Sequence, residues 1–340
     1  MKRLDLAIKT LFAEFQEACF QRTALEESVE GETFVKKEIK GKIYWYAQHY
    51  EKGKMIQKYF GPSNPETDKQ IIQQRGDKNE KQKLLREMIE DEKRRSAMLR
   101  RGGLPSLDST AAEIIEKCSS AKMIDGEGVL IGSYAFAAYS GILGVLFEKE
   151  SLRTLDIDIV PDRQIEVVTK QKIDWPYRAV PTFSHKSLPS SFIGPGKIRI
   201  DLLTPLQGKE KGVPNAPRIS GAGLQPLRFL DFLIESPIRT ILISPGGGIP
   251  VTIPHPVRFA IHKLIVSTYR PAVETAKKEK DLMQADQLIQ VLAKEQPTEL
   301  KEAYREAVDK GRKWKAAILK ACLQLPKETK EQLDYITTAS

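Results

Sequence analysis

Hydrophobic positions repeat at two different periods along the chain, and the changes of period divide it into segments. Residues 1–28 repeat at helical spacing and predict an amphipathic helix. Residues 32–62 carry three aromatic-rich runs separated by glycine turns, which predict a three-stranded antiparallel ribbon. Residues 66–100 are mostly charged with one narrow apolar stripe, which predicts a long helix that Arg75-Gly76-Asp77 can interrupt.

The middle of the chain mixes strand and helix patterns. The expected elements are a strand over 128–131, a helix over 134–146, and strands over 155–160 and 197–203. Strand-like runs also flank Pro245-Gly246-Gly247-Gly248, and no Lys-Ser/Thr follows this turn, so the pattern favours a hairpin over a phosphate-binding loop. From Pro256 the pattern is helical to the end of the chain.

These segments predict an α/β protein. We expect a small mixed sheet with flanking helices, a helical C-terminal domain and an N-terminal helix–ribbon–helix arm. The best linker candidate is Gly102-Gly103-Leu104-Pro105, and we expect an arm at 1–103, a core at 104–255 and a helical domain at 256–340.

Composition narrows the class of protein. A chain of 340 residues exceeds one typical domain, and 41% apolar content is enough for a buried core. The net charge of +9 favours a polyanionic partner, although a solvated basic surface explains it equally well. Cys19, Cys118 and Cys322 are far apart and odd in number, which indicates reduced thiols. No apolar run reaches membrane-spanning length, so we expect a soluble, cytoplasmic protein with no membrane partner.

Candidate chemistry gathers in the strands of the middle segment. Asp156 and Asp158 alternate with apolar residues, so both carboxylates project from one side of a strand, within reach of a shared divalent cation. Asp201 lies in another alternating strand. Upstream, the apolar run 128–131 breaks at Gly132-Ser133 into a helical pattern. Such a strand-to-helix turn offers backbone N–H groups and a hydroxyl to phosphate.

The order of these motifs along the chain resembles that in the nucleotidyltransferase fold of the DNA polymerase beta superfamily. Members carry a Gly-Ser turn, an Asp-x-Asp strand and a third acidic residue on a later strand. The resemblance covers about residues 104–300. It is closest to a bacterial branch distantly similar to abortive-infection and toxin–antitoxin nucleotidyltransferases.

The resemblance implies a reaction and a set of ligands. A nucleoside monophosphate would move from an NTP to a hydroxyl acceptor, with release of pyrophosphate. Asp156, Asp158 and Asp201 would be catalytic and would bind Mg²⁺ or Mn²⁺, because hard cations prefer oxygen ligands. Gly132 and Ser133 would hold phosphates of the nucleotide.

Three residues of the C-terminal region extend the expected nucleotide site. Lys263 lies on an apolar helix face, where its charge is costly unless a triphosphate uses it; the alternative is a snorkelling surface lysine. Arg270 follows two helical turns later. Asp281 would orient Lys263 or Arg270, or simply favour a helix N-terminus.

The acceptor is less defined than the reaction. Basic charge and the aromatic ribbon favour RNA, with the tRNA 3′ end suggested by the resemblance. On the ribbon we assign Trp45 to packing, and Tyr44 and Tyr46 to an open, base-stacking face; alternatively, all three aromatics only pack the ribbon. Arg199 shares the face of Asp201 and would contact substrate or lower the pKa of that carboxyl.

Other functions stay open. The acceptor can instead be a protein or a small molecule, and a toxin-like enzyme would have a cognate antitoxin. A different class is a non-catalytic nucleic-acid-binding protein whose nucleotide site only senses NTP.

Overall fold

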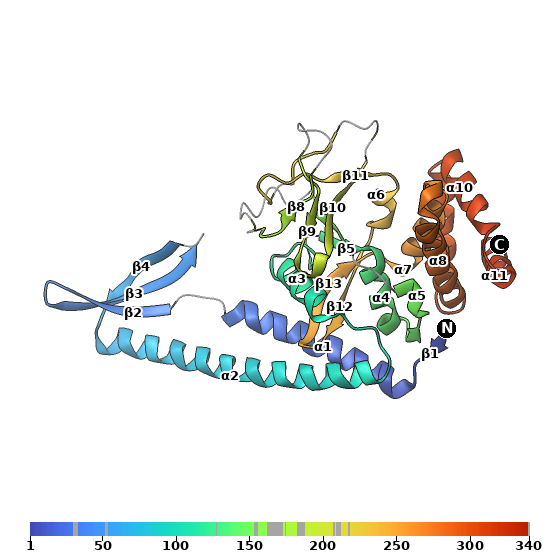
Figure 1. The fold of residues 1–340 in the computed structure, drawn as a ribbon. Helices are drawn as coiled ribbons and strands as arrows, with labels where there is room; N and C mark the ends of the chain where they lie inside the picture. Colours follow the sequence, from blue (N-terminus) through green and yellow to red (C-terminus); the bar gives the residue numbers. More distant parts are fainter. Residues whose placement is uncertain are drawn as a thin grey trace.

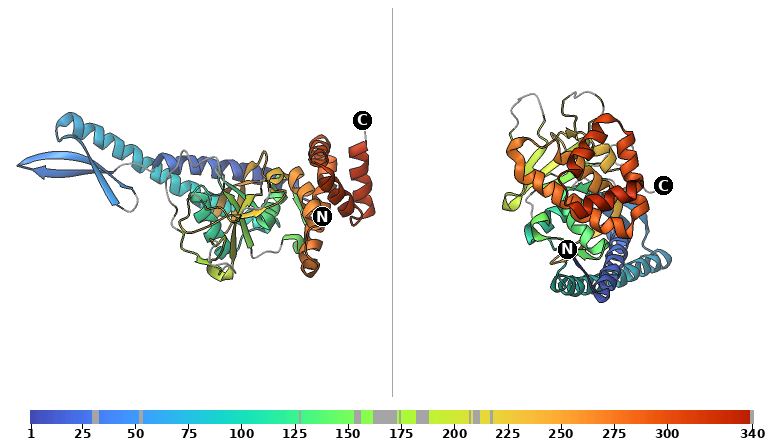
Figure 2. Two further views of the ribbon diagram at one scale, coloured as in Figure 1. Left: turned by 90° about the horizontal axis from the view of Figure 1, so that it is seen from above. Right: turned by 90° about the vertical axis from the view of Figure 1, so that its right-hand side faces the viewer.

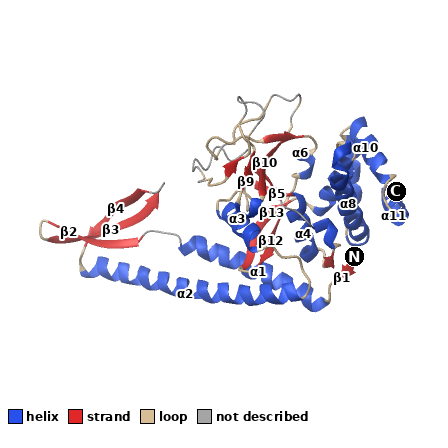
Figure 3. Cartoon of the chain, viewed as in Figure 1, coloured by secondary structure: helices blue, strands red, loops and turns tan. Residues whose placement is uncertain are grey.

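The computed structural model describes residues 1–29, 33–51, 54–126, 128–152, 156–161, 173, 175–181, 188–206, 208, 212–216 and 218–338. Figure 1 shows three parts in a row: a β-ribbon at one end, a mixed α/β core in the middle and a group of helices at the other end. The view from above in Figure 2 gives the same arrangement, and Figure 3 separates helices from strands by colour.

The N-terminal part consists of two helices and a three-stranded ribbon. Its elements are β1 (Lys2–Arg3), α1 (Leu6–Val29), β2 (Thr33–Ile39), β3 (Lys42–Glu51), β4 (Lys54–Pro62) and α2 (Pro65–Arg101). The strands pair in the order β2-β3-β4, all antiparallel, as the aromatic runs predict. The predicted interruption of α2 is wrong: the helix runs unbroken through Gly76. The Asn64 side chain caps its first turn, and Pro65 fits the first helical position.

The ribbon packs on α2 through the side chain of Trp45. Trp45 is only 5% exposed, and its indole N–H donates to Asp68 on α2 at 2.6 Å. The cationic ends of Lys36 and Arg75 lie over its ring, 4.8 and 5.0 Å from the centroid. The prediction that Trp45 packs the ribbon is therefore confirmed.

The central sheet has the strand order β5-β7-β10-β9-β8, with β11 paired to β10. These strands are β5 (Gly128–Ile131), β7 (Asp156–Pro161), β8 (Arg178–Ala179), β9 (Ser191–Ile193), β10 (Arg199–Pro205) and β11 (Gln225–Leu227). β7 runs parallel to β10, whereas β5 and β9 run antiparallel to their neighbours. The sheet is mixed, as expected; the first residue of the predicted strand 155–160 lies outside the described residues.

Short helices and a hairpin complete the core. They are α3 (Ser109–Ser120), α4 (Gly132–Ile142), β6 (Val145–Leu146), α5 (Lys149–Leu152), η2 (Pro195–Lys197), α6 (Leu230–Leu233), β12 (Ile238–Ser244) and β13 (Gly247–Ile253). β12 and β13 form the predicted hairpin. The expected helix over 134–146 ends earlier, because Gly144 adopts a left-handed conformation (φ 62°) that terminates α4. β6 follows and pairs with β1.

The C-terminal part is helical, as predicted. Its elements are α7 (Pro256–Ser267), η3 (Ala272–Glu274), α8 (Thr275–Glu295), α9 (Pro297–Asp309), α10 (Arg312–Cys322) and α11 (Lys327–Thr338). α7 and α8 pack on each other, and their buried side chains join the hydrophobic core of the sheet. Across the described ranges, no helix combines the length and apolar content that crossing a bilayer requires.

A hydrophobic cluster crosses the domain boundary expected at residue 103. Side chains of α1 and the end of α2 share it with the hairpin strand β12. Its buried members are Leu4, Phe12, Phe15, Cys19, Leu99, Leu104, Ile241 and Ile243. The inner halves of α1 and α2 therefore pack as part of the core, whereas the ribbon projects beyond it (Figure 1).

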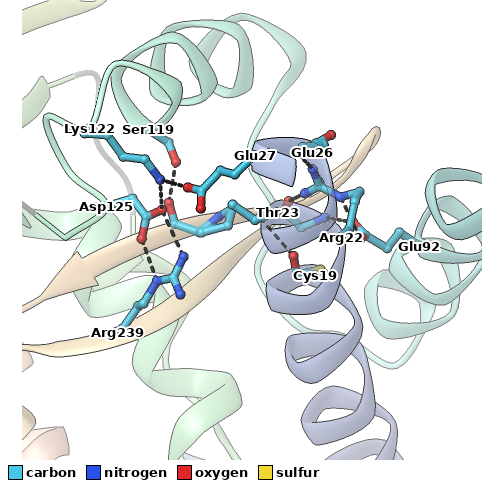
Figure 4. Close-up of polar contacts among 12 residues, drawn as sticks. Cys19, Arg22, Thr23, Glu26, Glu27, Glu92, Ser119, Lys122, Asp125 and Arg239 are labelled. Carbon is cyan, nitrogen blue, oxygen red and sulfur yellow. Dashed lines mark hydrogen bonds and ion pairs between the residues drawn. The ribbon is translucent and has the colours of Figure 1, made fainter. Parts of the chain in front are cut away.

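Buried ion pairs strengthen the same junction (Figure 4). Glu92 of α2 is 2% exposed and accepts from Arg22 of α1 at 2.7 Å. Both side chains also bond to the backbone of Gly248 in β13, Arg22 donating at 3.0 Å and Glu92 accepting at 3.3 Å. A charge buried this deeply is stable only when it is paired, so these contacts fix how α1 and α2 meet the hairpin.

We expect Trp45→Ala to loosen the ribbon without disturbing the core. Loss of a buried Trp side chain costs about 3–5 kcal/mol, and here the loss falls on the ribbon–α2 contact. Hydrogen exchange of the amides over 33–51 and 54–62 should become much faster. Trp45→Phe, which keeps an aromatic ring but loses the bond to Asp68, should show a smaller change. Unchanged exchange in Trp45→Ala would contradict the packing role.

Candidate active site

The register of the central sheet brings the predicted carboxylates together. Asp158 on β7 lies opposite Asp201 on the parallel strand β10, and Asp156 lies opposite Arg199. Paired positions on neighbouring strands project from the same face, and residues two apart on one strand share that face. The backbone therefore places all three aspartates on one side of the sheet.

Gly132 brings a helix N-terminus against the same carboxylates. Ile131, the residue before it, pairs with Asp158 across β5 and β7. Gly132 adopts φ +73°, and a β-carbon there would lie 2.4 Å from Asp158 Oδ2. Only glycine allows both this conformation and this close approach. Ser133 is buried in the first turn of α4, and the N-cap residue Ile131 makes no side-chain hydrogen bond to that turn, so it leaves the first backbone N–H groups uncapped.

Asp201 is held by cationic and hydroxyl donors. Arg199 Nε lies 2.9 Å from both of its carboxylate oxygens. The Ser191 hydroxyl donates to the same carboxylate, and Arg199 donates to that hydroxyl at 2.8 Å. Arg199 contacts Asp201 directly, whereas its predicted role toward substrate stays a prediction. Ser191 is a member of the site that the sequence pattern did not single out.

Asp158 is the most perturbed acid of the site. Burial, together with the neighbouring carboxylates of Asp201 and Asp156, raises the pKa of Asp158 to about 7. Lys263 and Arg270 act in the opposite direction. A buried carboxyl beside two like charges gains free energy from any cation that joins it.

The carboxylates are not assembled into a metal-binding group as they stand. Among the residues that the structure describes, no three His, Cys, Asp or Glu side chains are grouped closely enough to hold a metal ion. The Asp201 carboxylate is instead engaged by Arg199. The donor chemistry nevertheless fits Mg²⁺ or Mn²⁺, because three carboxylates share one face of the sheet. The Asp158 carboxyl is buried beside the like charges of Asp156 and Asp201.

A buried aspartate positions two cations beside these acids. Asp281, 2% exposed at the first turns of α8, accepts from Lys263 Nζ at 2.6 Å and from Arg270 Nε at 2.8 Å. Against the effect of burial, these two cations lower the pKa of Asp281. Asp281 therefore orients both cations, which was one of its two expected roles.

Two further residues of this region were not among the predicted site residues. Burial, and then the charge of Lys263, lowers the pKa of Lys280, which interacts electrostatically with Asp156 and Asp158. Its place beside Asp281 in the sequence was the available signal. Burial also lowers the pKa of His262 to about 3, so this histidine is neutral at pH 7.

The remaining predicted residues lie elsewhere. Tyr44 and Tyr46 are on the ribbon, which projects away from α7 and the core (Figures 1 and 2). Lys263 lies on α7, whereas Arg270 follows the end of α7 and is not helical. The two tyrosines are half-buried against Tyr59, with ring centroids 6.0 and 5.8 Å away. The ribbon and the carboxylate site are thus two separate regions of the protein.

A comparison with protein families identifies the class of enzyme. A family model described as nucleotidyltransferase matches residues 109–309, which is more than half of the chain. The chain belongs to this family and is a nucleotidyltransferase. The match contains the sheet, the three aspartates and the α7–α8 cations. No similarity to a curated protein or to a solved structure was found.

We predict that Gly132→Ala removes activity beyond what backbone strain explains. A left-handed alanine costs about 1–2 kcal/mol, and the new β-carbon would also displace the Asp158 carboxylate. Gly221→Ala is a matched control, because Gly221 has φ +74° and a β-carbon there would meet no atom within 4 Å. Both variants should lose similar stability in thermal unfolding, but only Gly132→Ala should lose NTP turnover. Equal turnover in the two would contradict the close approach.

The pKa of Asp158 predicts a pH-dependent stability in the absence of divalent cations. The folded protein holds this proton up to pH 7, whereas the unfolded chain releases it near pH 4. The free energy of unfolding should therefore fall as pH rises from about 4 to 7, by at most about 4 kcal/mol, and then level off. Denaturant titrations in EDTA should show this fall in wild type and lack it in Asp158→Asn. Parallel pH profiles would contradict the assignment.

Proposed function

We propose that the enzyme transfers a nucleoside monophosphate from an NTP to a hydroxyl acceptor and releases pyrophosphate. The observation that carries this proposal is the pairing of Asp158 with Asp201, next to the N-terminus of α4. Carboxylates facing a helix N-terminus and a pair of cations are the features that phosphoryl-transfer chemistry needs. Membership of the DNA polymerase beta superfamily remains part of this proposal.

Each side chain has a defined task in the proposed reaction. The N–H groups of Gly132 and Ser133 and the ammonium of Lys263 hold the outer phosphates. Arg270 adds a second positive charge, and Asp281 keeps both cations in place. These donors offset the charge that develops on the leaving pyrophosphate.

Asp156, Asp158 and Asp201 would hold Mg²⁺ or Mn²⁺. When bound, such a cation lowers the pKa of the acceptor hydroxyl and stabilises charge on the phosphates. To hold the cation, Asp201 would give up its contact with Arg199. Arg199, half of whose side chain is exposed, is then free to contact the substrate. Asp201 is the residue we expect to take the acceptor proton.

RNA is the acceptor that the ribbon supports best. Tyr44, Tyr46 and Tyr59 gather on the ribbon face opposite Trp45, and Lys37 lies over the Tyr46 ring at 5.1 Å from its centroid. Bases stack on such rings, and lysines neutralise phosphates. Because the ribbon lies at one end of the molecule and the candidate active site lies in the core, an acceptor that touches both must be a large molecule, such as a tRNA modified at its 3′ end.

A toxin-like enzyme with a cognate antitoxin is compatible with this acceptor. Nucleotide addition to a protein or a small molecule is the alternative reaction. Binding of RNA without pyrophosphate release would point to an NTP-sensing protein instead. One labelling experiment separates these possibilities.

We expect Asp158→Asn to abolish nucleotidyl transfer while the fold persists. The change is nearly isosteric, removes a ligand charge and relieves repulsion from the other carboxylates, so the melting temperature without metal should be unchanged or higher. The protein is incubated with each α-³²P-labelled NTP, Mg²⁺ and total cell extract, and label is measured in the RNA and protein fractions. Wild type should label RNA, and Asp158→Asn should label nothing.

Asp309→Asn is the control for this experiment, because Asp309 ends α9 and is exposed to solvent. It should label as wild type does. Label in the protein fraction alone would overturn the RNA acceptor, and full activity of Asp158→Asn would overturn the carboxylate mechanism.

Replacing Tyr44 and Tyr46 together by alanine should weaken RNA binding. Each lost base stack is worth about 1–3 kcal/mol, while global stability should change little, because Trp45 keeps the packing role. Fluorescence anisotropy with labelled single-stranded RNA measures the affinity at several salt concentrations. Tyr335→Ala, an exposed tyrosine on α11, is the matched control. An unchanged affinity of the double variant would remove the ribbon from acceptor binding.

A further inference from the structure

A small uncharged cavity lies on the flank of α4. Its volume is about 350 Å³, and every described residue that lines it is uncharged. Six of the lining residues are Leu107, Tyr134, Ala137, Leu152, Leu242 and Ile243. They come from the segment before α3, from α4, from the end of α5 and from the hairpin strand β12.

Two of the residues that line the cavity are close in the chain to residues of the candidate active site. Tyr134 directly follows Gly132-Ser133 in the first turn of α4. Leu152 ends α5, four positions before Asp156. One wall of the cavity therefore belongs to the helix whose N-terminus is expected to hold phosphates, and another wall ends four residues before the first carboxylate.

The tyrosine links the cavity to the carboxylates electrostatically. Burial, with smaller effects of Asp108 and Asp156, raises the pKa of Tyr134 to about 12. The Tyr134 hydroxyl therefore stays protonated at neutral pH and can donate a hydrogen bond. The side chain offers a ligand both a ring surface and a polar group that can fix its orientation.

The size and chemistry of the cavity restrict its ligand. The described lining residues carry no charge, so they do not offer a triphosphate the cationic donors that it needs. Its volume lies at the lower end of the range of about 300–1,000 Å³ for small-molecule sites. One planar ring system fits such a space better than a whole nucleotide.

We propose that this cavity receives the base of the NTP substrate. The inference rests on the proposed function, since it takes the triphosphate to lie at the N-terminus of α4 and beside Lys263. The two ends of the nucleotide then bind to the same helix, with phosphates at its start and the base along its flank. Ala137, one turn after Tyr134, limits the depth of the base site.

Binding of two ligands to the full-length protein tests this assignment. Isothermal titration calorimetry measures the affinity for each of the four common ribonucleoside triphosphates and for inorganic tripolyphosphate, all with Mg²⁺. Ala137→Leu fills the cavity from α4. Ser106→Phe, at an exposed position on its rim, blocks it without altering the core. Ala316→Leu on the exposed face of α10 is the matched control.

Wild type should bind at least one NTP about tenfold or more tightly than tripolyphosphate, because base contacts with aromatic and apolar side chains are worth at least that factor. Ala137→Leu and Ser106→Phe should lose this preference and keep the affinity for tripolyphosphate. Ala316→Leu should behave as wild type.

Two results would overturn the inference and leave the proposed function standing. One is an NTP affinity of wild type no higher than its affinity for tripolyphosphate. The other is an unchanged NTP preference in both cavity variants while they remain folded by circular dichroism. Failure of wild type to bind either ligand would instead overturn the proposed function, and the base site with it.

Discussion

The burial of the Asp158 carboxyl is the constraint on which the rest of the active site depends. Strand pairing places it beside Asp201, and Gly132 presses a helix start against it. The carboxyl is therefore surrounded by backbone and like charges, and its pKa is raised. A site of this kind is stable without a ligand because the proton is retained, and in the proposed mechanism a cation would take the place of that proton.

Positive charge is supplied from a different part of the chain. Asp281 fixes Lys263 and Arg270 on the helical side of the site, and its burial makes this arrangement rigid. Helix α8, which carries Asp281, also holds the segment before β7. Gln284 donates to the Ser151 carbonyl at 2.7 Å, and Gln287 accepts from the Glu148 N–H at 2.9 Å. α8 therefore couples the position of the cations to the chain that leads into the carboxylate strand.

Much of the fold can be predicted from local patterns. The ribbon, the hairpin and the strands of the three aspartates each carry a clear period or turn, and the structure contains them. The early end of α4 depends on the left-handed Gly144, and the continuity of α2 depends on its propensity over a long stretch that outweighs one Gly76. A period-based prediction treats both glycines alike, so it errs at both.

The candidate site can be predicted only in part. Alternation shows that Asp156 and Asp158 share a face, but the pairing of Asp158 with Asp201 depends on strand register, which joins segments some forty residues apart. Arg199 contacts Ser191 because β9 and β10 pair as neighbouring strands, and the cavity beside Tyr134 arises from packing between distant segments. No spacing in the sequence marks them.

The central claim is that the carboxylates of β7 and β10 hold the catalytic cation and that α4 and Lys263 hold the triphosphate. Anomalous diffraction from crystals grown with Mn²⁺ and a non-hydrolysable NTP analogue tests it most directly. The account predicts a manganese peak between Asp158 and Asp201, with the phosphates of the analogue directed to Gly132 and Lys263. A manganese peak elsewhere, or a triphosphate bound away from α4, would contradict it.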